Sequence, residues 1–282
     1  MAQVGRLTHD DLEQAVALSR GVGWNQTPDD WARLLTLAPD GVFAAFEAGR
    51  LVASSSLVAY GDALAWVGMM IVDAEHRGRG LGKHLLDAAL ASPTRAPGAI
   101  VGLDATDLGA PLYRGRGFVD VESIDRWSGV LATATASEGT DVRVANPADV
   151  VKLAAWDAAR TGIDRRALVT HLLHASAPDA WLASRGGELV GYAALRPGRT
   201  HRHLGPLLAE DEAAFTALTA AIARRSEGAP VFADVVRSPA TGAAFTRTGL
   251  RVERRLSRMT LMHPKRVLSG APVWATAGLE WG

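Results

Sequence analysis

The chain has 282 residues, 48% of them hydrophobic, and its 30 Lys and Arg residues balance 30 Asp and Glu residues. Because domains commonly span ~100–200 residues, this length favours two domains, and the zero formal charge argues against nucleic acid or an anionic membrane as a partner. The absence of cysteine excludes disulfides, thiolate metal sites and cysteine nucleophiles, and it is typical of proteins from a reducing cytoplasm.

The N-terminal sequence shows no targeting segment. Its first residues, MAQVGRLTHDDLEQAV, lack the apolar core of a signal peptide. The longest apolar stretch, residues 63–72, is far shorter than the ~20 residues that cross a bilayer. We therefore expect a cytoplasmic protein.

The first predicted hairpin recurs later in the chain. Residues 42–57, VFAAFEAGRLVASSSL, and residues 180–195, AWLASRGGELVGYAAL, each place a glycine turn between two apolar runs. This pattern is typical of two antiparallel strands. From the hairpin glycine to the glycine of the following strand, the spacing is 19 residues in the first half and 18 in the second. Hairpins are common enough to match by chance, but the matched spacing favours an internal duplication.

The remaining elements follow in the same order in both halves. A strand leads into a helix, and a further strand then carries an aspartate, Asp104 or Asp234. An aromatic residue follows, four positions before a glycine: it is Tyr113 in the first half and Phe245 in the second. The two halves therefore predict two α/β domains of one fold.

A segment between the halves predicts the domain boundary. Residues 129–140, GVLATATASEGT, are small or polar and lack strong periodicity, as linkers do. We predict one domain over residues 1–130 and a second over residues 141–282.

A glycine-rich turn, RGRGLG at residues 77–82, separates the strand that ends at Val72 from a predicted helix over residues 81–90. The first amides of a helix lack intrahelical partners and lie at its positive end, which favours phosphate or pyrophosphate. Glycine allows positive φ and close approach of a ligand to the backbone, and basic side chains add charge. The residues concerned are Gly78, Gly80, Gly82, Arg77, Arg79 and Lys83.

The spacing of the turn differs from that of two common phosphate-binding loops. A P-loop requires four residues between its glycines and then Lys followed by Ser or Thr, and a dinucleotide fingerprint requires G-x-G-x-x-G. Neither spacing is present in residues 77–82. A glycine-rich connection without a ligand does not account for three basic residues around three glycines.

The turn resembles the acetyl-coenzyme A signature of the GNAT N-acetyltransferase superfamily, Q/R-x-x-G-x-G/A, in Arg77, Gly80 and Gly82. A second family motif is similar to residues 106–118, although Thr106 stands where the family usually has Asn, which puts one cofactor contact in doubt. The resemblance covers residues 1–128 and implies GNAT-like domains in tandem, each a mixed, mostly antiparallel central sheet flanked by helices. The cofactor contacts that it implies are Met70, Ile71, Val72, Arg77, Gly78, Arg79, Gly80, Leu81, Gly82, Lys83, Thr106 and Tyr113.

The family chemistry implies roles for two residues. Tyr113 is the candidate acid that protonates the leaving thiolate, since the family places a tyrosine here for that purpose; alternatively it packs against the cofactor. An alkylammonium has a pKa near ~10.4, so the acceptor must lose a proton before it attacks. Asp104 is the candidate base, unless it caps the turn that follows or the proton leaves through ordered water.

The second half resembles the same fold with its cofactor loop lost. Glu210, Asp211 and Glu212 stand at the start of its helix, where acidic side chains would repel a pyrophosphate. Phe245 replaces Tyr113 and cannot donate a proton. We therefore expect the second half to bind no coenzyme A.

The sequence thus predicts an acetyl-CoA-dependent N-acetyltransferase that acts by direct attack of a small-molecule amine, such as an amino acid, amine metabolite or antibiotic. Trp24 and Trp31, near the helices that cover the acceptor cleft in the family, are candidate substrate contacts or core residues. We expect no metal and no nucleic acid or membrane partner, and a homodimer is possible. An acyl-CoA-binding sensor without turnover is the alternative.

Overall fold

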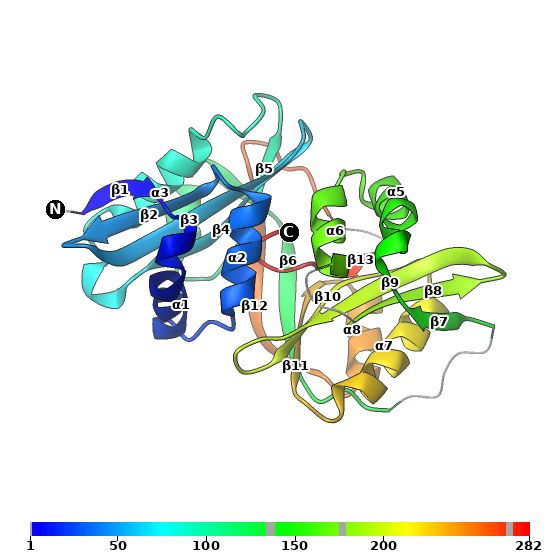
Figure 1. Cartoon of the computed structure of the whole chain (residues 1–282). Coiled ribbons are helices and arrows are strands. Elements are labelled where there is room, and N and C mark those ends of the chain that lie inside the picture. The colour runs from blue at the N-terminus through cyan, green and yellow to red at the C-terminus, as the bar shows by residue number, and fades with distance from the viewer. Residues whose placement is uncertain (1, 134–138, 175–178, 269–272) are drawn as a thin grey trace. The chain divides into compact units, whose positions relative to one another are not determined.

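The computed structural model describes residues 2–133, 139–174, 179–268 and 273–282 (Figure 1). The chain forms two compact units that each contain segments from distant parts of the sequence. Unit 1 comprises residues 1–119, 259–264 and 281, and unit 2 comprises residues 120–258, 265–280 and 282. The predicted domains, 1–130 and 141–282, stay a prediction, and part of the predicted linker, residues 134–138, lies outside the described residues.

Unit 1 contains a mixed sheet in the order β1-β2-β3-β4-β5. Its strands are β1 (Gln3–Arg6), β2 (Val42–Glu47), β3 (Arg50–Tyr60), β4 (Leu64–Val72) and β5 (Ile100–Ala105). The first three pairings are antiparallel, and only β4 and β5 run parallel. This arrangement confirms the mixed, mostly antiparallel sheet that the sequence predicts.

The predicted hairpin between β2 and β3 is present, and its turn has two positive φ angles, 49° at Ala48 and 77° at Gly49. Two consecutive positive φ angles give the backbone twist that matches the twist of the flanking strands. In unit 2 the equivalent turn has φ of 58° at Gly186 and 85° at Gly187. The glycines that mark both hairpins in the sequence thus have a conformational reason.

The helices of unit 1 are α1 (Leu12–Gly21), α2 (Pro28–Leu37), α3 (Leu81–Leu90) and α4 (Ala110–Arg114). Thr27 caps α2, because its hydroxyl accepts from the amide of Asp30 at 3.2 Å while Asp30 accepts from the amide of Thr27 at 2.9 Å. Helix α3 has the predicted bounds, and Leu81, Leu85 and Leu86 are buried in a core with β2–β5. Figure 1 shows α1 and α2 in front of β3 and β4.

Unit 2 repeats this plan with strands in the order β7-β8-β9-β10-β11-β6. Strands β10 and β11 run parallel and the other neighbours in this order run antiparallel. Two strands, β6 (Phe118–Gly129) and β12 (Arg251–Leu261), have most of their residues in unit 2 and the rest in unit 1. The other strands and the helices of unit 2 are β7 (Asp141–Val144), α5 (Val150–Thr161), α6 (Arg166–His174), β8 (Ala180–Arg185), β9 (Glu188–Arg196), β10 (Arg202–Ala209), α7 (Glu212–Ser226), β11 (Val231–Val236), α8 (Pro239–Arg247) and β13 (Val273–Ala275).

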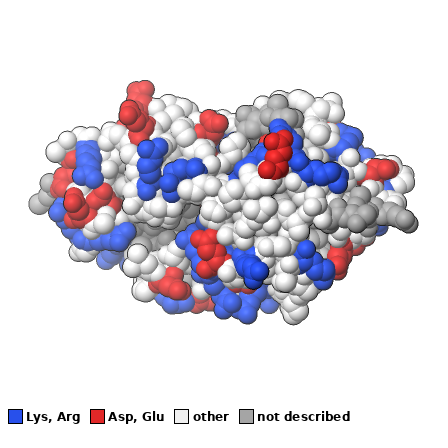
Figure 2. Space-filling view, turned by 90° about the horizontal axis from the view of Figure 1, so that it is seen from below, with Lys and Arg blue, Asp and Glu red and all other residues white. Residues whose placement is uncertain are grey.

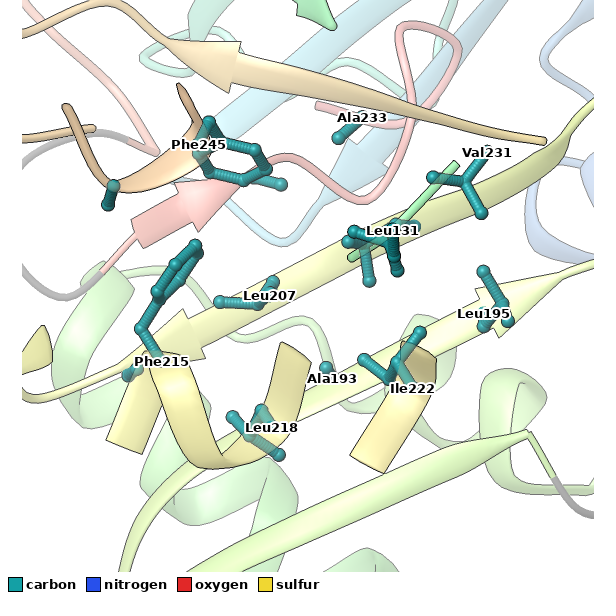
Figure 3. Packing of buried hydrophobic residues seen from close by; sticks show 14 of the residues in the cluster. Leu131, Ala193, Leu195, Leu207, Phe215, Leu218, Ile222, Val231, Ala233 and Phe245 are labelled. Atoms are coloured by element: carbon teal, nitrogen blue, oxygen red, sulfur yellow. The ribbon is translucent and has the colours of Figure 1, made fainter. Parts of the chain in front are cut away.

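The main core of unit 2 lies between its sheet and helices α7 and α8 (Figure 3). Phe215 and Phe245 meet edge to face with ring centroids 5.2 Å apart, and Leu207 and Leu218 pack beside them. Aromatic side chains bury large apolar areas, so this cluster stabilises the unit strongly. Phe245 is therefore a core residue of unit 2, and its counterpart in the sequence repeat, Tyr113, belongs to the core of unit 1.

Lys and Arg side chains are interspersed with Asp and Glu on the face drawn in Figure 2, in keeping with a formal charge of zero. Across the described ranges, no helix has both the length and the apolar character needed to span a membrane.

Candidate functional site

Strand β4 parts from β5 after its first three residues. The parallel register joins Leu64–Trp66 to residues 100–102, yet β4 continues to Val72 and β5 to Ala105. The pairing of β4 with β3 also shifts register, at a bulge where Met69 has a φ of 46°. A bulge bends a strand and re-aims the residues beyond it. Met70, Ile71 and Val72 thus lie beyond the stretch of β4 that pairs with β5, as the family resemblance implies.

The glycine-rich turn leaves the start of α3 open. Gly78 and Gly80 have φ of 75° and 79°, and Gly80 is the N-cap residue of α3 without a side-chain hydrogen bond. The first helical bond runs from the amide of His84 to the carbonyl of Gly80 at 3.1 Å. The amides of residues 81–83 therefore precede this ladder, and nothing in the described part of the chain accepts from them. Three adjacent donors at the positive end of a helix can bind a diphosphate.

Gly82 serves a different purpose from the other two glycines. Its φ is not positive, and a Cβ there would lie 3.4 Å from Leu112 Cδ2 and 3.6 Å from Val72 Cγ2. The expectation that all three glycines need positive φ is therefore wrong for Gly82, which sits inside the first turn of α3 in close packing.

Two of the basic side chains of the turn interact with other groups of unit 1. Arg77 Nε donates to the carbonyl of Val72 at 3.2 Å, and Arg79 forms an ion pair with Glu47 at 3.1 Å. Arg77, Arg79 and Lys83 are all exposed. An exposed ion pair is worth little, so an incoming diphosphate can compete for Arg79.

The buried side chain of His76 helps to hold the glycine-rich turn in place. The two ring nitrogens of His76 lie 3.1 Å from Glu47 Oε2 and 3.0 Å from Asp73 Oδ1. Asp73 also accepts from the amide of Glu75 at 3.0 Å and pairs with Arg50 at 2.9 Å. The hydrogen bond from His76 holds the pKa of Asp73 below its ordinary value. These contacts fix the segment between β4 and α3 before any ligand arrives.

The sequence analysis identified neither Glu47 nor His76 as a residue with a part in organising the turn. The structure gives that part to the carboxylate of Asp73 and the amide of Glu75. Glu47 lies 29 residues from His76 and 32 from Arg79, so no local spacing signals the contact.

Tyr113 on α4 is buried, with only 6% of its surface exposed, and it packs edge to face on Phe118. Its ring belongs to the core formed with α3, and burial raises the pKa of its hydroxyl above the ordinary value. No described residue makes a hydrogen bond with this hydroxyl. A protonated phenol without an internal acceptor can donate to a ligand.

Thr106 shapes the start of α4. Its Oγ1 accepts from the amide of Gly109 at 3.2 Å, and its carbonyl accepts from the amides of Gly109 and Ala110, each at 2.9 Å. The hydroxyl can still donate one hydrogen bond, so the contact put in doubt by the missing Asn is chemically possible.

Asp104 points to the sheet face opposite Tyr113. Its neighbours Leu103 and Ala105 belong to the core with α3, and side chains alternate along a strand. Gly102 shares the face of Asp104, and a Cβ there would meet the Trp66 ring at 2.6 Å. Asp104 is half-buried and lies beyond the last residue that pairs with β4. Tyr113, the candidate acid, and Asp104, the candidate base, therefore lie on opposite faces of the sheet, near the point where β4 and β5 part.

The two tryptophans differ. Trp31 has no exposed surface, and its indole Nε1 donates to Ser19 Oγ at 3.2 Å. This environment gives Trp31 a packing role in unit 1 and offers a ligand no surface. Trp24 is half-buried, so a contact with the acceptor stays a prediction for it.

A cavity of about 550 Å³ in unit 1 lies between α1 and residues 73–75, and neither Tyr113 nor Asp104 lines it. It adjoins the turn on the side of Arg50 and Leu51. The cavity thus neighbours the residues that brace the turn and not the candidate acid and base.

Unit 2 lacks the features that open α3. Asp211 caps α7 by accepting from the amide of Ala214 at 2.9 Å, so a carboxylate holds the position where unit 1 leaves free amides. Arg185 pairs with Asp211 at 2.8 Å, and this hydrogen bond lowers the pKa of the carboxyl. Phe245, in the place of Tyr113, is completely buried. That unit 2 binds no coenzyme A stays a prediction.

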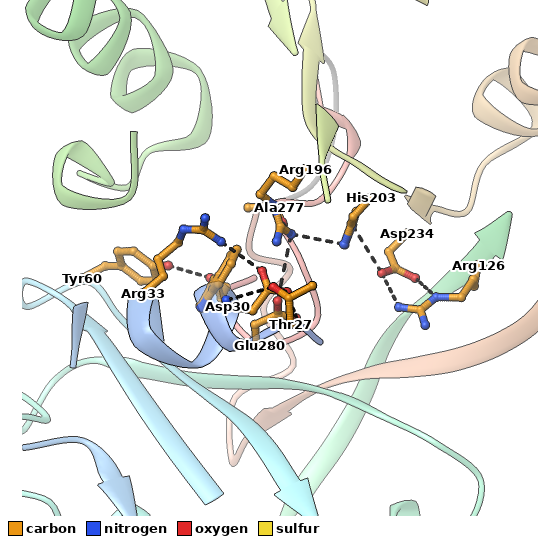
Figure 4. A network of polar contacts seen from close by, with 11 residues as sticks. Thr27, Asp30, Arg33, Tyr60, Arg126, Arg196, His203, Asp234, Ala277 and Glu280 are labelled. Atoms are coloured by element: carbon orange, nitrogen blue, oxygen red, sulfur yellow. Dashed lines mark hydrogen bonds and ion pairs between the residues drawn. The ribbon is translucent and has the colours of Figure 1, made fainter. Parts of the chain in front are cut away.

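Asp234, the counterpart of Asp104, is locked in an ion pair (Figure 4). Arg126 donates to both of its carboxylate oxygens, at 2.8 and 2.7 Å. Burial alone would raise the pKa of Asp234, but the charge and hydrogen bonds of Arg126 hold it below the ordinary value. His203 Nε2 lies 3.7 Å from the same carboxylate, and its Nδ1 lies 3.1 Å from Arg196. A carboxylate held in this way is not available as a base.

Comparison with known proteins places both halves in one family. Residues 38–120 and residues 153–268 each match an "Acetyltransferase (GNAT) domain". The uncharacterized N-acetyltransferase YitH of Bacillus subtilis is 25% identical over 207 residues, 72% of either chain. Holothin acyltransferase of a Pseudoalteromonas species is 27% identical over 215 residues, 75% of this chain and 71% of its own.

Solved structures share the fold over nearly the whole chain. A protein from Pyrococcus horikoshii has a TM-score of 0.79 at 19% identity and covers 100% of this chain and 96% of its own. A tandem GNAT protein from the clavulanic acid biosynthesis pathway has a TM-score of 0.66 at 14% identity, covering 96% of this chain and 100% of its own. Together with the two domain matches, these likenesses show that the chain belongs to the GNAT acetyltransferase family and carries two such domains in tandem.

Proposed function

We propose that the protein is an acetyl-CoA-dependent N-acetyltransferase whose first unit carries the active site and whose acceptor is a small-molecule amine. Membership of the GNAT family supports acyl transfer in general. The observation that carries the finer proposal is the combination, in unit 1, of a parted strand pair with an uncapped helix start. Unit 2 has a capped helix start in the same place.

The residues of unit 1 fit the donor. The amides of residues 81–83 suit the diphosphate, with Arg77, Arg79 and Lys83 adding charge around it. Backbone groups of Met70, Ile71 and Val72 suit the amide-bearing arm, since they lie beyond the part of β4 that pairs with β5. When bound, acetyl-CoA supplies a thioester whose carbonyl carbon is the acyl group to be transferred.

Protons must move on both sides of that reaction. Asp104 on one sheet face takes a proton from the ammonium group of the acceptor, directly or through water, so that a neutral amine attacks the carbonyl. Tyr113 on the other face donates its phenolic proton to the sulfur as the carbon–sulfur bond breaks. Because burial raises the pKa of Tyr113, the phenol keeps this proton at neutral pH.

The acceptor class is proposed from the relatives. The name of the Pseudoalteromonas protein says that it acylates holothin, and that of the Bacillus protein says that it is an N-acetyltransferase. We extend this to an amine-bearing small molecule, such as an amino acid, an amine metabolite or an antibiotic.

Thiol release from acetyl-CoA in the presence of a panel of amines tests the proposal. A panel first ranked by thermal shift with acetyl-CoA present narrows the search. Amine-dependent release that is lost in Tyr113→Phe is expected. Coenzyme A binding without release by any amine would instead favour a non-catalytic sensor, and no binding at all would refute the proposal.

A further inference from the structure

The two strands of unit 2 that correspond to β4 and β5 also part from one another. Parallel pairing between β10 and β11 covers only Arg202 with Val231 and His203 with Phe232, although both strands continue further. The groove that opens beyond this point has the same origin as the parting of β4 from β5.

In unit 2 the chain itself fills this groove. Strand β13 pairs antiparallel with β10, through Leu207 with Ala275 and Leu208 with Val273. On the other side, the amide of Thr276 donates to the carbonyl of Asp234 on β11 at 2.8 Å. The short strand therefore bonds to both walls of the groove.

Side chains anchor the strand at the end of the groove nearest α7. The indole of Trp274 donates to the carbonyl of Ala209 at 2.8 Å and stacks on Phe215, with ring centroids 4.5 Å apart. Ala275, Thr276 and neighbouring Ala277 are at most 2% exposed. Trp274 thus lies beside the first turn of the helix that corresponds to α3.

A glycine in β10 makes room for the strand. A Cβ at Gly205 would lie 2.1 Å from the carbonyl oxygen of Thr276, a distance that no packing adjustment of a side chain can relieve. Gly205 is the residue that matches Gly68 of β4 in the sequence repeat. The backbone of β13 therefore runs directly against the part of β10 that has no side chain.

We infer that the groove between β10 and β11 is a peptide-strand site, which the chain's own residues 273–276 occupy in the place where unit 1 is proposed to hold the arm of its cofactor. Both ligands are extended chains whose amides can bond to strand backbone, so one groove can serve either. The duplicated unit has thus kept the groove and changed its ligand from a thioester carrier to a segment of protein. The position of β13 does not depend on the proposed acetyl transfer.

Hydrogen exchange on the full chain, followed by mass spectrometry of a peptide spanning residues 273–277, tests the inference without any cofactor. Strong protection is expected in the wild type. In Gly205→Ala, whose added carbon collides with Thr276, these amides should exchange near the rate of unstructured chain while β8 and β9 stay protected. Gly242→Ala is the matched control, because its Cβ meets nothing within 4 Å. Protection retained in Gly205→Ala would overturn the inference.

If Gly205→Ala does not fold, a milder variant tests the inference instead. Trp274→Phe keeps an aromatic ring on Phe215 and removes the donor to Ala209, so exchange of residues 273–277 should accelerate about fivefold, the factor for one ordinary hydrogen bond. Unchanged exchange would contradict the anchoring role.

Saturation with acetyl-CoA gives the last arm of the test. Protection of residues 273–277 should stay constant, because the ligand of unit 1 does not compete for this groove. Faster exchange together with two bound cofactors per chain would show that β13 yields to coenzyme A and would refute the inference. If no cofactor binds at all, only the proposed function fails, since protection of β13 is measured independently.

Discussion

Replacing Gly80 by alanine should strain the backbone at the start of α3, and the free energy cost can be estimated from the structure. Gly80 has a φ of 79°, a conformation that costs a residue with a Cβ roughly 1–2 kcal/mol. The new Cβ would approach only His84 Cε1, at 3.9 Å, so the cost is backbone strain and not a clash. We expect the free energy of unfolding to fall by ~1 kcal/mol and the thermal midpoint by a few degrees.

The effect on cofactor affinity should be larger than the effect on stability. Relief of the strain by a negative φ would turn the amide of Leu81 away from the proposed diphosphate. A hydrogen bond to a charged group contributes about 1.5–3 kcal/mol, which corresponds to roughly 10- to 150-fold weaker binding. Calorimetric titration with coenzyme A measures this loss, and circular dichroism measures the midpoint.

Gly98→Ala is the control for the same substitution in the same unit, because its φ is not positive and its Cβ meets nothing within 4 Å. It should bind coenzyme A as the wild type does. If Gly80→Ala is destabilised as expected but binds as tightly as Gly98→Ala, the amides at the start of α3 do not hold the diphosphate.

Three further predictions concern single side chains. Tyr113→Phe should lower kcat for thiol release by roughly 100-fold or more and change the affinity for acetyl-CoA little, and full turnover would remove its acid role. Because the pKa of Asp73 is lowered in the folded protein, its carboxylate stabilises the fold above its ordinary pKa of about 4, and this stabilisation is lost as the pH falls through the lower folded value. The destabilisation of Asp73→Asn, measured by urea unfolding at pH 7, should therefore shrink toward pH 2. A difference between wild type and variant that stays constant with pH would contradict this. Arg126→Met removes the guanidinium that pairs with the buried Asp234 and should cost about 3 kcal/mol of stability in guanidinium unfolding. Most of this cost should be recovered in Arg126→Met with Asp234→Leu, and failure of the double variant to recover would place the cost elsewhere.

Features that depend on short spacings were predictable. The hairpin turns need two positive φ angles, and glycine marks them in both halves. Helix α3 has the predicted bounds because its start and its buried leucines follow a local pattern. An acidic N-cap on α7 was predictable for the same reason, since Asp211 sits next to the helix that it caps.

Features that depend on distant partners were not predictable. Nothing near Trp31 in the sequence separates a buried indole that donates to Ser19 from one that faces a ligand. Likewise, no local pattern shows that a Cβ at Gly82 would meet Leu112 and Val72, since these neighbours come from α4 and β4.

The sequence by itself indicated the repeat, the glycine-rich turn and the family, because each rests on short motifs of residues that are close in the chain. Only the tertiary structure decided that Glu47 and Asp73 hold His76 beneath the turn, and that β13 occupies the groove of unit 2. Leu207 and Ala275 pair across 68 residues of chain, and a short apolar strand carries no local signal of the groove that it enters. Such contacts form because buried backbone groups must find partners, wherever along the chain those partners lie.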